Sequence, residues 1–288
     1  MKQRLLLAGL GVLAAHLLIG CTPEAADEAA EPSSSTTETQ AAGEGTLALV
    51  ANGEDFVRQG FVTKDGWQID FENVYITLDD ATAYQTEPPF DPDSSEELSA
   101  TNEVTFIEEP QTVDLAAGDE DADPVEVATQ TAPTGTYNAL AWKVTEATEG
   151  PAAGHTIVLN GTATKDGQTV NFAMNLDQPL EYTCGQFVGD ERKGILSDEA
   201  ELEATFHFDH LFGDGEAPTD DPINQGAVGF EPFVALAQDG TLEVDQATLE
   251  AELPAEDYQK LQAALNGLGH VGEGHCRLEG EVVEHSHE

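Results

Sequence analysis

Residues 156–176 consist of two alternating runs, Thr156-Ile-Val-Leu-Asn-Gly-Thr-Ala-Thr-Lys165 and Gln168-Thr-Val-Asn-Phe-Ala-Met-Asn-Leu176, on either side of Asp166-Gly167. Asp-Gly is a preferred two-residue turn because both central residues must adopt a positive φ. In the second run apolar and polar residues alternate, which is typical of a strand with one buried and one solvated face. These residues predict a β-hairpin.

Similar runs lie on both sides of this hairpin. We expect strands at residues 56–62, 67–78, 111–115, 137–145, 155–165, 169–176, 199–209 and 241–249. Residues 255–265 have the pattern of a helix, with Pro254 suited to its first turn and Gly267 to its end. The sequence therefore predicts an all-β fold, an antiparallel β-sandwich with one short C-terminal helix. We expect one domain over residues 46–288, and a division near Gly150 is the alternative.

The charge balance excludes two classes of partner. The chain of 288 residues has 56 acidic and 10 basic residues, a formal net charge of −46. So few cations cannot build the basic stripe of a nucleic-acid-binding protein or a polybasic contact with an anionic membrane. The sequence also has no nucleophile elbow, no His-Glu-x-x-His motif and no phosphate-binding loop. We therefore predict that the protein is not an enzyme.

The N-terminus has the pattern of an export signal. Lys2 and Arg4 precede an apolar run over residues 5–19, which ends in Leu18-Ile19-Gly20-Cys21. This ending resembles the lipobox of bacterial lipoproteins. The resemblance implies removal of residues 1–20, diacylation of Cys21 and a lipid-anchored, extracytoplasmic protein. Thr22 after the cysteine resembles the pattern for sorting to the outer membrane, and a plain secretory signal with an unused cysteine is the alternative.

The segment after Cys21 has a different composition from the rest of the chain. Residues 22–45 are rich in Ala, Glu, Ser, Thr and Pro and have no aromatic residue. Such a segment buries too little apolar surface to become ordered. We expect residues 21–45 to be the lipidated cysteine and a disordered acidic tether that separates the sandwich from the membrane.

A second resemblance lies within the expected sandwich. Val113-Asp-Leu115, followed by Ala132-Pro-Thr-Gly-Thr-Tyr-Asn-Ala-Leu-Ala-Trp-Lys-Val144, is similar to a module of exported β-sandwich proteins. Those proteins include uncharacterised bacterial lipoproteins and a copper-associated periplasmic family. The resemblance implies an exported β-sandwich, and the other motifs of the copper-associated family are missing from this chain.

Cys184 and Cys276 are the only cysteines besides Cys21. In an exported chain in an oxidising compartment, we expect these two to form a disulfide that closes a loop of about 92 residues. Two buried free thiols are the alternative. The disulfide would bring the Gly-rich segment at residues 267–275 close to Cys184.

Residues 201–214 contain the strongest candidate for a metal site. If this segment continues as a strand, Thr205, His207 and Asp209 share one face, with neighbours on that face roughly 7 Å apart. His207 and Asp209 could then converge on one ion, and His210 could turn to the same side. The expected disulfide would add His270 and His275. Nitrogen and oxygen ligands of this kind suit Zn²⁺ or Cu²⁺, and surface or hydrogen-bonded histidines are the alternative.

Two other segments have weaker metal signals. The carboxylates of residues 119–123, with Glu126, alternate as in a calcium loop, but Pro124 stands where an EF-hand needs glycine. We interpret this segment as a solvated acidic loop. The C-terminal Glu284-His285-Ser286-His287-Glu288 is either a weak metal-binding tail or an exposed, solvated end.

Together these observations predict a lipid-anchored extracytoplasmic protein that captures Zn²⁺ or Cu²⁺ through histidines and aspartate. The alternative is a non-enzymatic structural or interaction lipoprotein that binds no metal and presents its loops to another envelope protein.

Overall fold

The computed structural model describes residues 43–280. The expected signal peptide, Cys21, nearly all of the tether and the C-terminal His-containing tail lie outside these residues. Within them the chain forms sixteen strands, and their bounds are β1 (Glu44–Asn52), β2 (Phe61–Val62), β3 (Gln68–Thr86), β4 (Ala100–Thr105), β5 (Gln111–Asp114), β6 (Val125–Pro133), β7 (Gly135–Thr136), β8 (Ala139–Val144), β9 (Ile157–Lys165), β10 (Gln168–Leu176), β11 (Leu180–Cys184), β12 (Ile195–Leu196), β13 (Glu199–Phe206), β14 (Thr241–Asp245), β15 (Gly269–Val271) and β16 (Gly274–Leu278).

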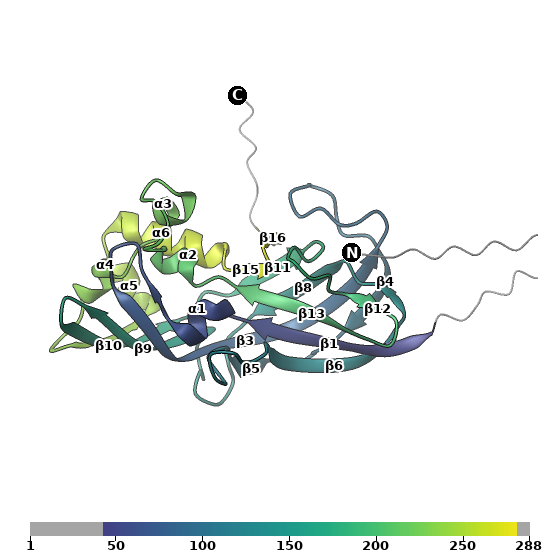
Figure 1. Ribbon diagram of the computed structural model, residues 1–288, viewed down its shortest axis with the longest axis horizontal. Helices are drawn as coiled ribbons and strands as arrows, with labels where there is room; N and C mark the ends of the chain where they lie inside the picture. The colour runs from purple at the N-terminus through teal and green to yellow at the C-terminus, as the bar shows by residue number, and fades with distance from the viewer. Residues whose placement is uncertain (1–42, 281–288) are drawn as a thin grey trace, which may run out of the picture. The chain divides into compact units, whose positions relative to one another are not determined.

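Fourteen of these strands form one large, curled, mixed sheet (Figure 1), and β7 and β12 pair with each other in a separate two-stranded sheet. The order of the large sheet is β14-β10-β9-β3-β8-β11-β16-β15-β13-β1-β6, with β2, β4 and β5 also paired to the long strand β3. Most neighbours are antiparallel, but β1 pairs with β13, and β10 with β14, in parallel. The prediction of a mostly β protein is confirmed. The expected antiparallel sandwich is not confirmed, because the sheet is mixed and continues through eleven strands.

The hairpin at residues 157–176 forms as predicted. Asp166 and Gly167 have φ values of 52° and 81°, the positive values that the two-residue turn requires. β9 and β10 pair in antiparallel register from Lys165 opposite Gln168 to Ile157 opposite Leu176. The alternating apolar residues of β10 are buried, and β9 pairs on its other edge with β3.

The structure has six helices in its described part where one was expected. They are α1 (Glu54–Gln59), α2 (Asp209–Phe212), α3 (Pro222–Gly226), α4 (Glu231–Val234), α5 (Gln246–Glu252) and α6 (Ala255–Asn266). Only α6 is long enough to show helical periodicity in the sequence, and its expected position is confirmed. α2–α6 gather at one end of the sheet (Figure 1). None of these helices combines the length and apolarity needed to cross a bilayer.

Three expected strands are wrong in part because helices replace them. α1 occupies most of residues 56–62, and β14 ends at Asp245, whose side chain accepts a hydrogen bond from the backbone N–H of Thr248 and caps α5. This capping bond supplies the first turn of the helix with an acceptor, which the strand pattern does not reveal. β13 ends at Phe206, and α2 begins at Asp209.

An aromatic core fixes the end of β13 and the helix after it. Phe206, Phe208 and Phe212 have no exposed surface. Phe208 packs on Phe71 of β3, with 6.2 Å between ring centroids. Burial of aromatic side chains contributes much of the stability of a core. Because residues on both sides of Asp209 and His210 are held in this core, the backbone of these two polar residues is fixed.

Candidate metal centre

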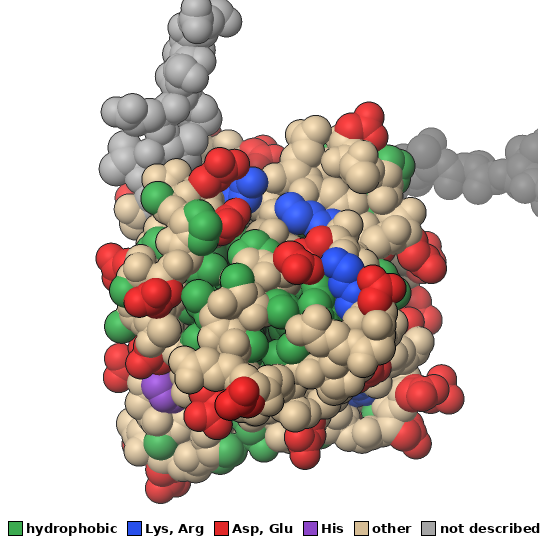
Figure 2. Space-filling view, turned by 90° about the vertical axis from the view of Figure 1, so that its left-hand side faces the viewer, with side chains coloured by type: hydrophobic (Ala, Val, Ile, Leu, Met, Phe, Trp, Pro, Cys, Tyr) green, Lys and Arg blue, Asp and Glu red, His purple; other side chains and the backbone are tan. Residues whose placement is uncertain are grey.

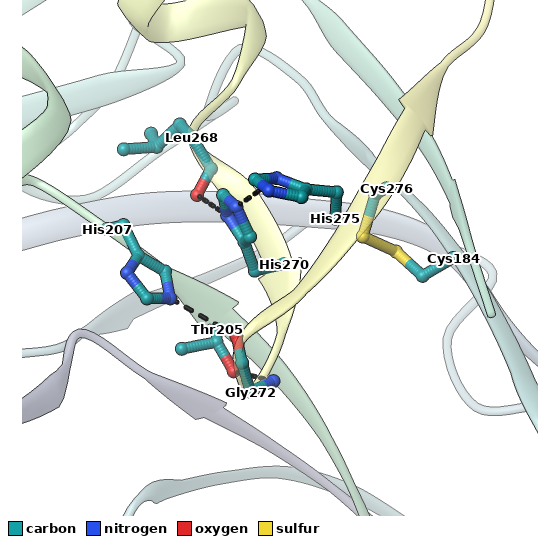
Figure 3. The surroundings of a disulfide bond; sticks show 8 residues. All are labelled: Cys184, Thr205, His207, Leu268, His270, Gly272, His275 and Cys276. Carbon is teal, nitrogen blue, oxygen red and sulfur yellow. Dashed lines mark hydrogen bonds between the residues drawn. A yellow bond between two sulfur atoms is a disulfide. The ribbon is translucent and has the colours of Figure 1, made fainter. Parts of the chain in front are cut away.

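A disulfide joins β11 to β16 beside the candidate centre (Figure 3). Cys184 and Cys276 are directly opposite each other in the sheet, with 4.2 Å between their Cα atoms, and this agrees with the predicted pairing. β16 pairs in turn with β15, where His270 lies opposite His275. The disulfide therefore anchors the short hairpin that carries both histidines.

β13 brings the other histidines to the same place. Thr205 in β13 lies opposite His270 in β15, and the backbone N–H of His207 donates to the carbonyl of Leu268. The chain then turns into α2, which begins at Asp209 and includes His210. All five predicted residues are thus gathered from two segments that are about sixty residues apart in the sequence.

His207, Asp209 and His210 form the tightest group. Each offers one possible ligand atom, and these atoms lie within 4.8 Å of one another. The distance from His207 Nδ1 to Asp209 Oδ1 is 4.0 Å. In the described part of the chain this is the only group of three or more His, Cys, Asp or Glu residues with such spacing.

The predicted strand geometry of this group was wrong, although its three residues do lie close together. Asp209 does not share a strand face with His207, because β13 ends at Phe206 and Asp209 lies in the first turn of α2. The backbone N–H of His210 donates to the carbonyl of His207 at 3.1 Å, and this turn brings together side chains that would be roughly 7 Å apart on one face of a strand. The turn also brings His210 to the same side, where a continued strand would have pointed it away.

Backbone carbonyls fix the orientation of three imidazole rings. The bonds run from His207 Nε2 to Gly272 O at 3.2 Å, from His210 Nδ1 to Gly267 O at 3.1 Å and from His270 Nδ1 to Leu268 O at 3.3 Å. A carbonyl only accepts, so the named nitrogen of each ring carries the hydrogen. In the neutral ring the other nitrogen then keeps a lone pair. A metal-binding histidine has the same arrangement, in which one nitrogen donates to the protein and the other binds the ion.

All three carbonyls come from residues 267–272, which lead into and form the hairpin. Its tip is held by the hydroxyl of Thr205, which accepts from the backbone N–H of Gly272 at 2.8 Å and donates to Glu203 at 3.1 Å. Glu203 in turn accepts from Lys193. This buried network fixes the position of the Gly272 carbonyl and, through it, the His207 ring.

His270 and His275 form a separate pair within the cluster (Figure 3). His270 Nε2 lies 3.0 Å from His275 Nδ1. The His270 ring packs against His207 at 4.4 Å between centroids and against His210 at 5.1 Å. His270 is buried, whereas His275 is exposed. The rings are therefore together, but the ligand atoms of this pair do not converge with those of the group at His207.

Glu54 also lies beside the candidate centre, and the sequence did not reveal it. Its Oε2 lies 3.5 Å from His207 Nδ1. Glu54 begins α1 with a φ of 59°, and its backbone N–H donates to the side chain of Asn52. Because β1 and β13 run parallel, with Asn52 opposite Thr205, the residues that follow both strands meet at one edge of the sheet. To predict the position of Glu54 from the sequence, the parallel pairing of β1 with β13 would have to be predicted first.

Burial changes the protonation of these groups. It raises the pKa of the Asp209 and Glu54 carboxyl groups and lowers the pKa of His210. Burial and the nearby imidazoles of His207 and His210 lower the pKa of His270 to about 3. Desolvation disfavours the charged form of each group, so His270 is neutral at pH 7 and keeps its lone pair.

A pocket gives solvent access to the centre. His210 and His275 both line it, and its volume is about 460 Å³. Apolar side chains from α3 and α6 form much of its wall, among them Ile223 and Ala264. The exposed face at the helical end of the molecule has many acidic side chains and few basic ones, with apolar side chains toward its middle (Figure 2).

The acidic loop at residues 118–124 has a structural role. The guanidinium of Arg58 in α1 donates hydrogen bonds to the carbonyl of Ala117, just before the loop, and to those of Ala122 and Asp123 within it. The Arg58 side chain therefore holds the backbone of this loop against α1.

Comparison with known proteins assigns no relationship: no family model, no curated protein and no solved structure matches this chain.

Proposed function

We propose that the protein is a lipid-anchored extracytoplasmic protein that captures Zn²⁺ or Cu²⁺ through His207, Asp209 and His210. One observation supports this most directly. Because His207 Nε2–H donates to Gly272, the other ring nitrogen, Nδ1, is the one that lies 4.0 Å from Asp209 Oδ1 and 3.5 Å from Glu54 Oε2. An unprotonated ring nitrogen and carboxylate oxygens at these distances repel one another unless a proton or a metal ion lies between Nδ1 and the carboxylates.

The environment of the Asp209 carboxylate favours a metal ion over a proton between these groups. The residue is 6% exposed, and its Oδ1 is buried with no hydrogen-bond donor in the described part of the chain. A buried carboxylate oxygen without a donor is costly, and such atoms are rare in folded proteins. A bound cation would satisfy this oxygen and offset the desolvation of both carboxylates.

The spacing of the donors is close to that of a bound ion. Zn–N and Zn–O bonds of about 2.0–2.1 Å in a tetrahedral site place neighbouring ligand atoms about 3.3 Å apart. The distance between Glu54 and His207 is near this value, and the distance between His207 and Asp209 needs a contraction of less than about 1 Å. Small rotations of the side chains are enough for this, and Glu54 would then add a second carboxylate beside His207.

The chemistry of the donors selects the ion. Imidazole and carboxylate suit Zn²⁺ and Cu²⁺, whereas Cu⁺ prefers thiolate and thioether. Cys184 and Cys276 are bonded to each other, and Met174 is buried in β10. The net charge of −46 also raises the local concentration of cations. The lipobox-like sequence that ends at Cys21 supports the membrane anchor.

Elemental analysis of untagged protein tests the metal. We expect the mature chain to bind about one equivalent of Zn²⁺ or Cu²⁺ tightly, and His207→Ala with His210→Ala to remove this binding. The matched control is His155→Ala, because His155 is partly buried and paired with Asp177 outside the group. His285→Ala with His287→Ala measures any contribution from the C-terminal tail.

Two results would contradict the proposal. Unchanged stoichiometry in the His207 and His210 double variant would exclude this site. An absence of tight binding in the wild-type protein would favour the alternative, an interaction lipoprotein, and co-purification of an envelope protein would support it. The anchor has its own test: Cys21→Ser should move the protein from the membrane fraction to the soluble fraction.

A further inference from the structure

His270 and His275 have the geometry of a second position for the same ion. The distance of 3.0 Å between His270 Nε2 and His275 Nδ1 is close to the value of about 3.3 Å expected for two nitrogens on one tetrahedral ion. His270 is held in place by its Nδ1 bond to Leu268. His275 is exposed. The pair therefore offers two imidazole nitrogens at the boundary between solvent and the buried group.

The proton between these two rings can move without net release. His270 Nδ1 carries a hydrogen because it donates to Leu268, so Nε2 of the neutral ring accepts the Nδ1–H of His275. An ion that binds both nitrogens needs the His275 hydrogen to shift from Nδ1 to Nε2. Solvent can carry this proton because the His275 ring is exposed: one hydrogen leaves Nδ1 and one is taken up at Nε2, so no proton is released overall.

The rings form a continuous series from solvent to the buried group. Ring centroids are separated by 4.8 Å from His275 to His270 and by 4.4 Å from His270 to His207. His210, which belongs to the buried group, lines the same pocket as His275. An ion in this pocket can therefore contact both His275 of the exposed pair and His210 of the buried group.

The two positions differ in strength. The outer pair supplies two neutral imidazoles, and water fills the remaining positions on the ion. The inner group supplies two imidazoles and the carboxylates of Asp209 and Glu54, whose negative charge strengthens the binding of a cation. An ion that arrives at the outer pair therefore gains affinity by moving inward, as a transit position requires.

We propose that His270 and His275 form an outer metal position that takes the ion from the pocket and passes it to His207, Asp209 and His210. This inference rests on the proposed function of the inner group.

Stopped-flow mixing of the full untagged chain with Zn²⁺ tests the route. We expect His275→Ala to slow association about tenfold, because the ion loses its first ligand near solvent. His155→Ala is the matched control, and its association rate should equal that of the wild type. An unchanged rate in His275→Ala, with tight Zn²⁺ binding in the wild type, overturns the transit position alone. No tight binding in the wild type overturns the proposed function instead.

A binding experiment tests the outer position by itself. In a His207→Ala, Asp209→Asn, His210→Ala variant, Zn²⁺ should bind weakly, and ¹⁵N NMR should show the His275 hydrogen moving from Nδ1 to Nε2. A further His270→Ala change should remove both effects. Circular dichroism and the intact disulfide report whether each variant is folded. A folded triple variant whose His275 tautomer ignores Zn²⁺ contradicts the inference.

Discussion

The β9–β10 hairpin and the β15–β16 hairpin are both short antiparallel pairs, but their conformations depend on different parts of the chain. The first is specified by its own residues: an Asp-Gly turn and alternating apolar side chains. The second is only three and five residues long and is held by a disulfide, by Thr205 and by its neighbours in the sheet. The comparison shows that the candidate metal centre lies where local sequence has the least control and long-range contacts have the most.

The largest expected effect is on the second hairpin when its disulfide is removed. Cys184→Ser with Cys276→Ser should lower the free energy of unfolding by roughly 4 to 5 kcal/mol, the chain-entropy value for a loop of 92 residues. Zn²⁺ affinity should fall as well, because the carbonyls that orient the imidazoles lie next to β16. Denaturant unfolding and Zn²⁺ titration measure the two effects. A stability loss below about 1 kcal/mol with unchanged affinity would show that long-range contacts other than the disulfide hold the hairpin.

Matched glycine substitutions compare the two turns directly. Gly272 has a φ of 60°, and an added Cβ would lie 2.1 Å from the carbonyl oxygen of Val188. Gly167 has a φ of 81° and open space around it. Gly272→Ala should therefore cost about 3 kcal/mol and weaken Zn²⁺ binding. Gly167→Ala should cost about 1 kcal/mol for its left-handed backbone alone and leave Zn²⁺ binding intact. Equal effects on metal binding would contradict the distinction between the two hairpins.

Asp209→Asn should separate function from stability. The change removes a buried charge that has no hydrogen-bond donor at Oδ1, so the metal-free protein should gain about 1 kcal/mol. Zn²⁺ affinity should fall about 10- to 100-fold or more because a ligand loses its charge. Asp177→Asn is the matched control: it loses the His155 pair and should not change the affinity. A metal-free Asp209→Asn protein that is less stable than the wild type would refute this reading of the site.

The smallest expected effect is that the His270 ring does not take up a proton during a pH titration. Because the pKa of His270 is about 3, its ring should stay neutral from pH 8 to pH 5. In the unfolded chain a histidine has a pKa of about 6.5. Between about pH 6.5 and pH 3 the unfolded state therefore holds more protons than the folded state, and His270 lowers the free energy of unfolding as the pH falls. Asp209 and Glu54, with raised pKa values, act in the opposite sense.

The prediction is measured by following the NMR chemical shift of the His270 ring with pH. The loss of this signal in a His270→Gln variant identifies it. A midpoint above about pH 6 would mean that water reaches the ring and that the cluster is open.

How far the sequence could predict the molecule depends on the range of each interaction. The β9–β10 hairpin and α6 were predictable because turn chemistry and periodicity lie within a few residues. α1 and α2 were not, because six and four residues show no period. The proximity of His207, Asp209 and His210 could be predicted from their spacing in the sequence, and that of His270 and His275 from the expected disulfide. Their geometry could not, because it depends on β13 ending at Phe206, which the aromatic core decides.

The position of Glu54 could not be predicted from its neighbours in the sequence. Its place beside His207 follows from the parallel pairing of β1 and β13, and these strands are about 150 residues apart. Nothing near Glu54 in the sequence signals this partner. A positive φ at a non-glycine residue is often found at functional sites, but it can be recognised only in a structure.

The placement of β1 has a mechanical consequence. The strand has partners on both edges, with seven residue pairs to β13 and eight to β6. A force applied along the chain at Glu44 would load both rows of hydrogen bonds in shear, so many bonds would have to break together rather than one after another. The far end of the same strand leads within two residues to Glu54. Tension that displaced β1 would therefore pull this carboxylate away from His207, so extraction of the strand and disruption of the candidate centre would be one event.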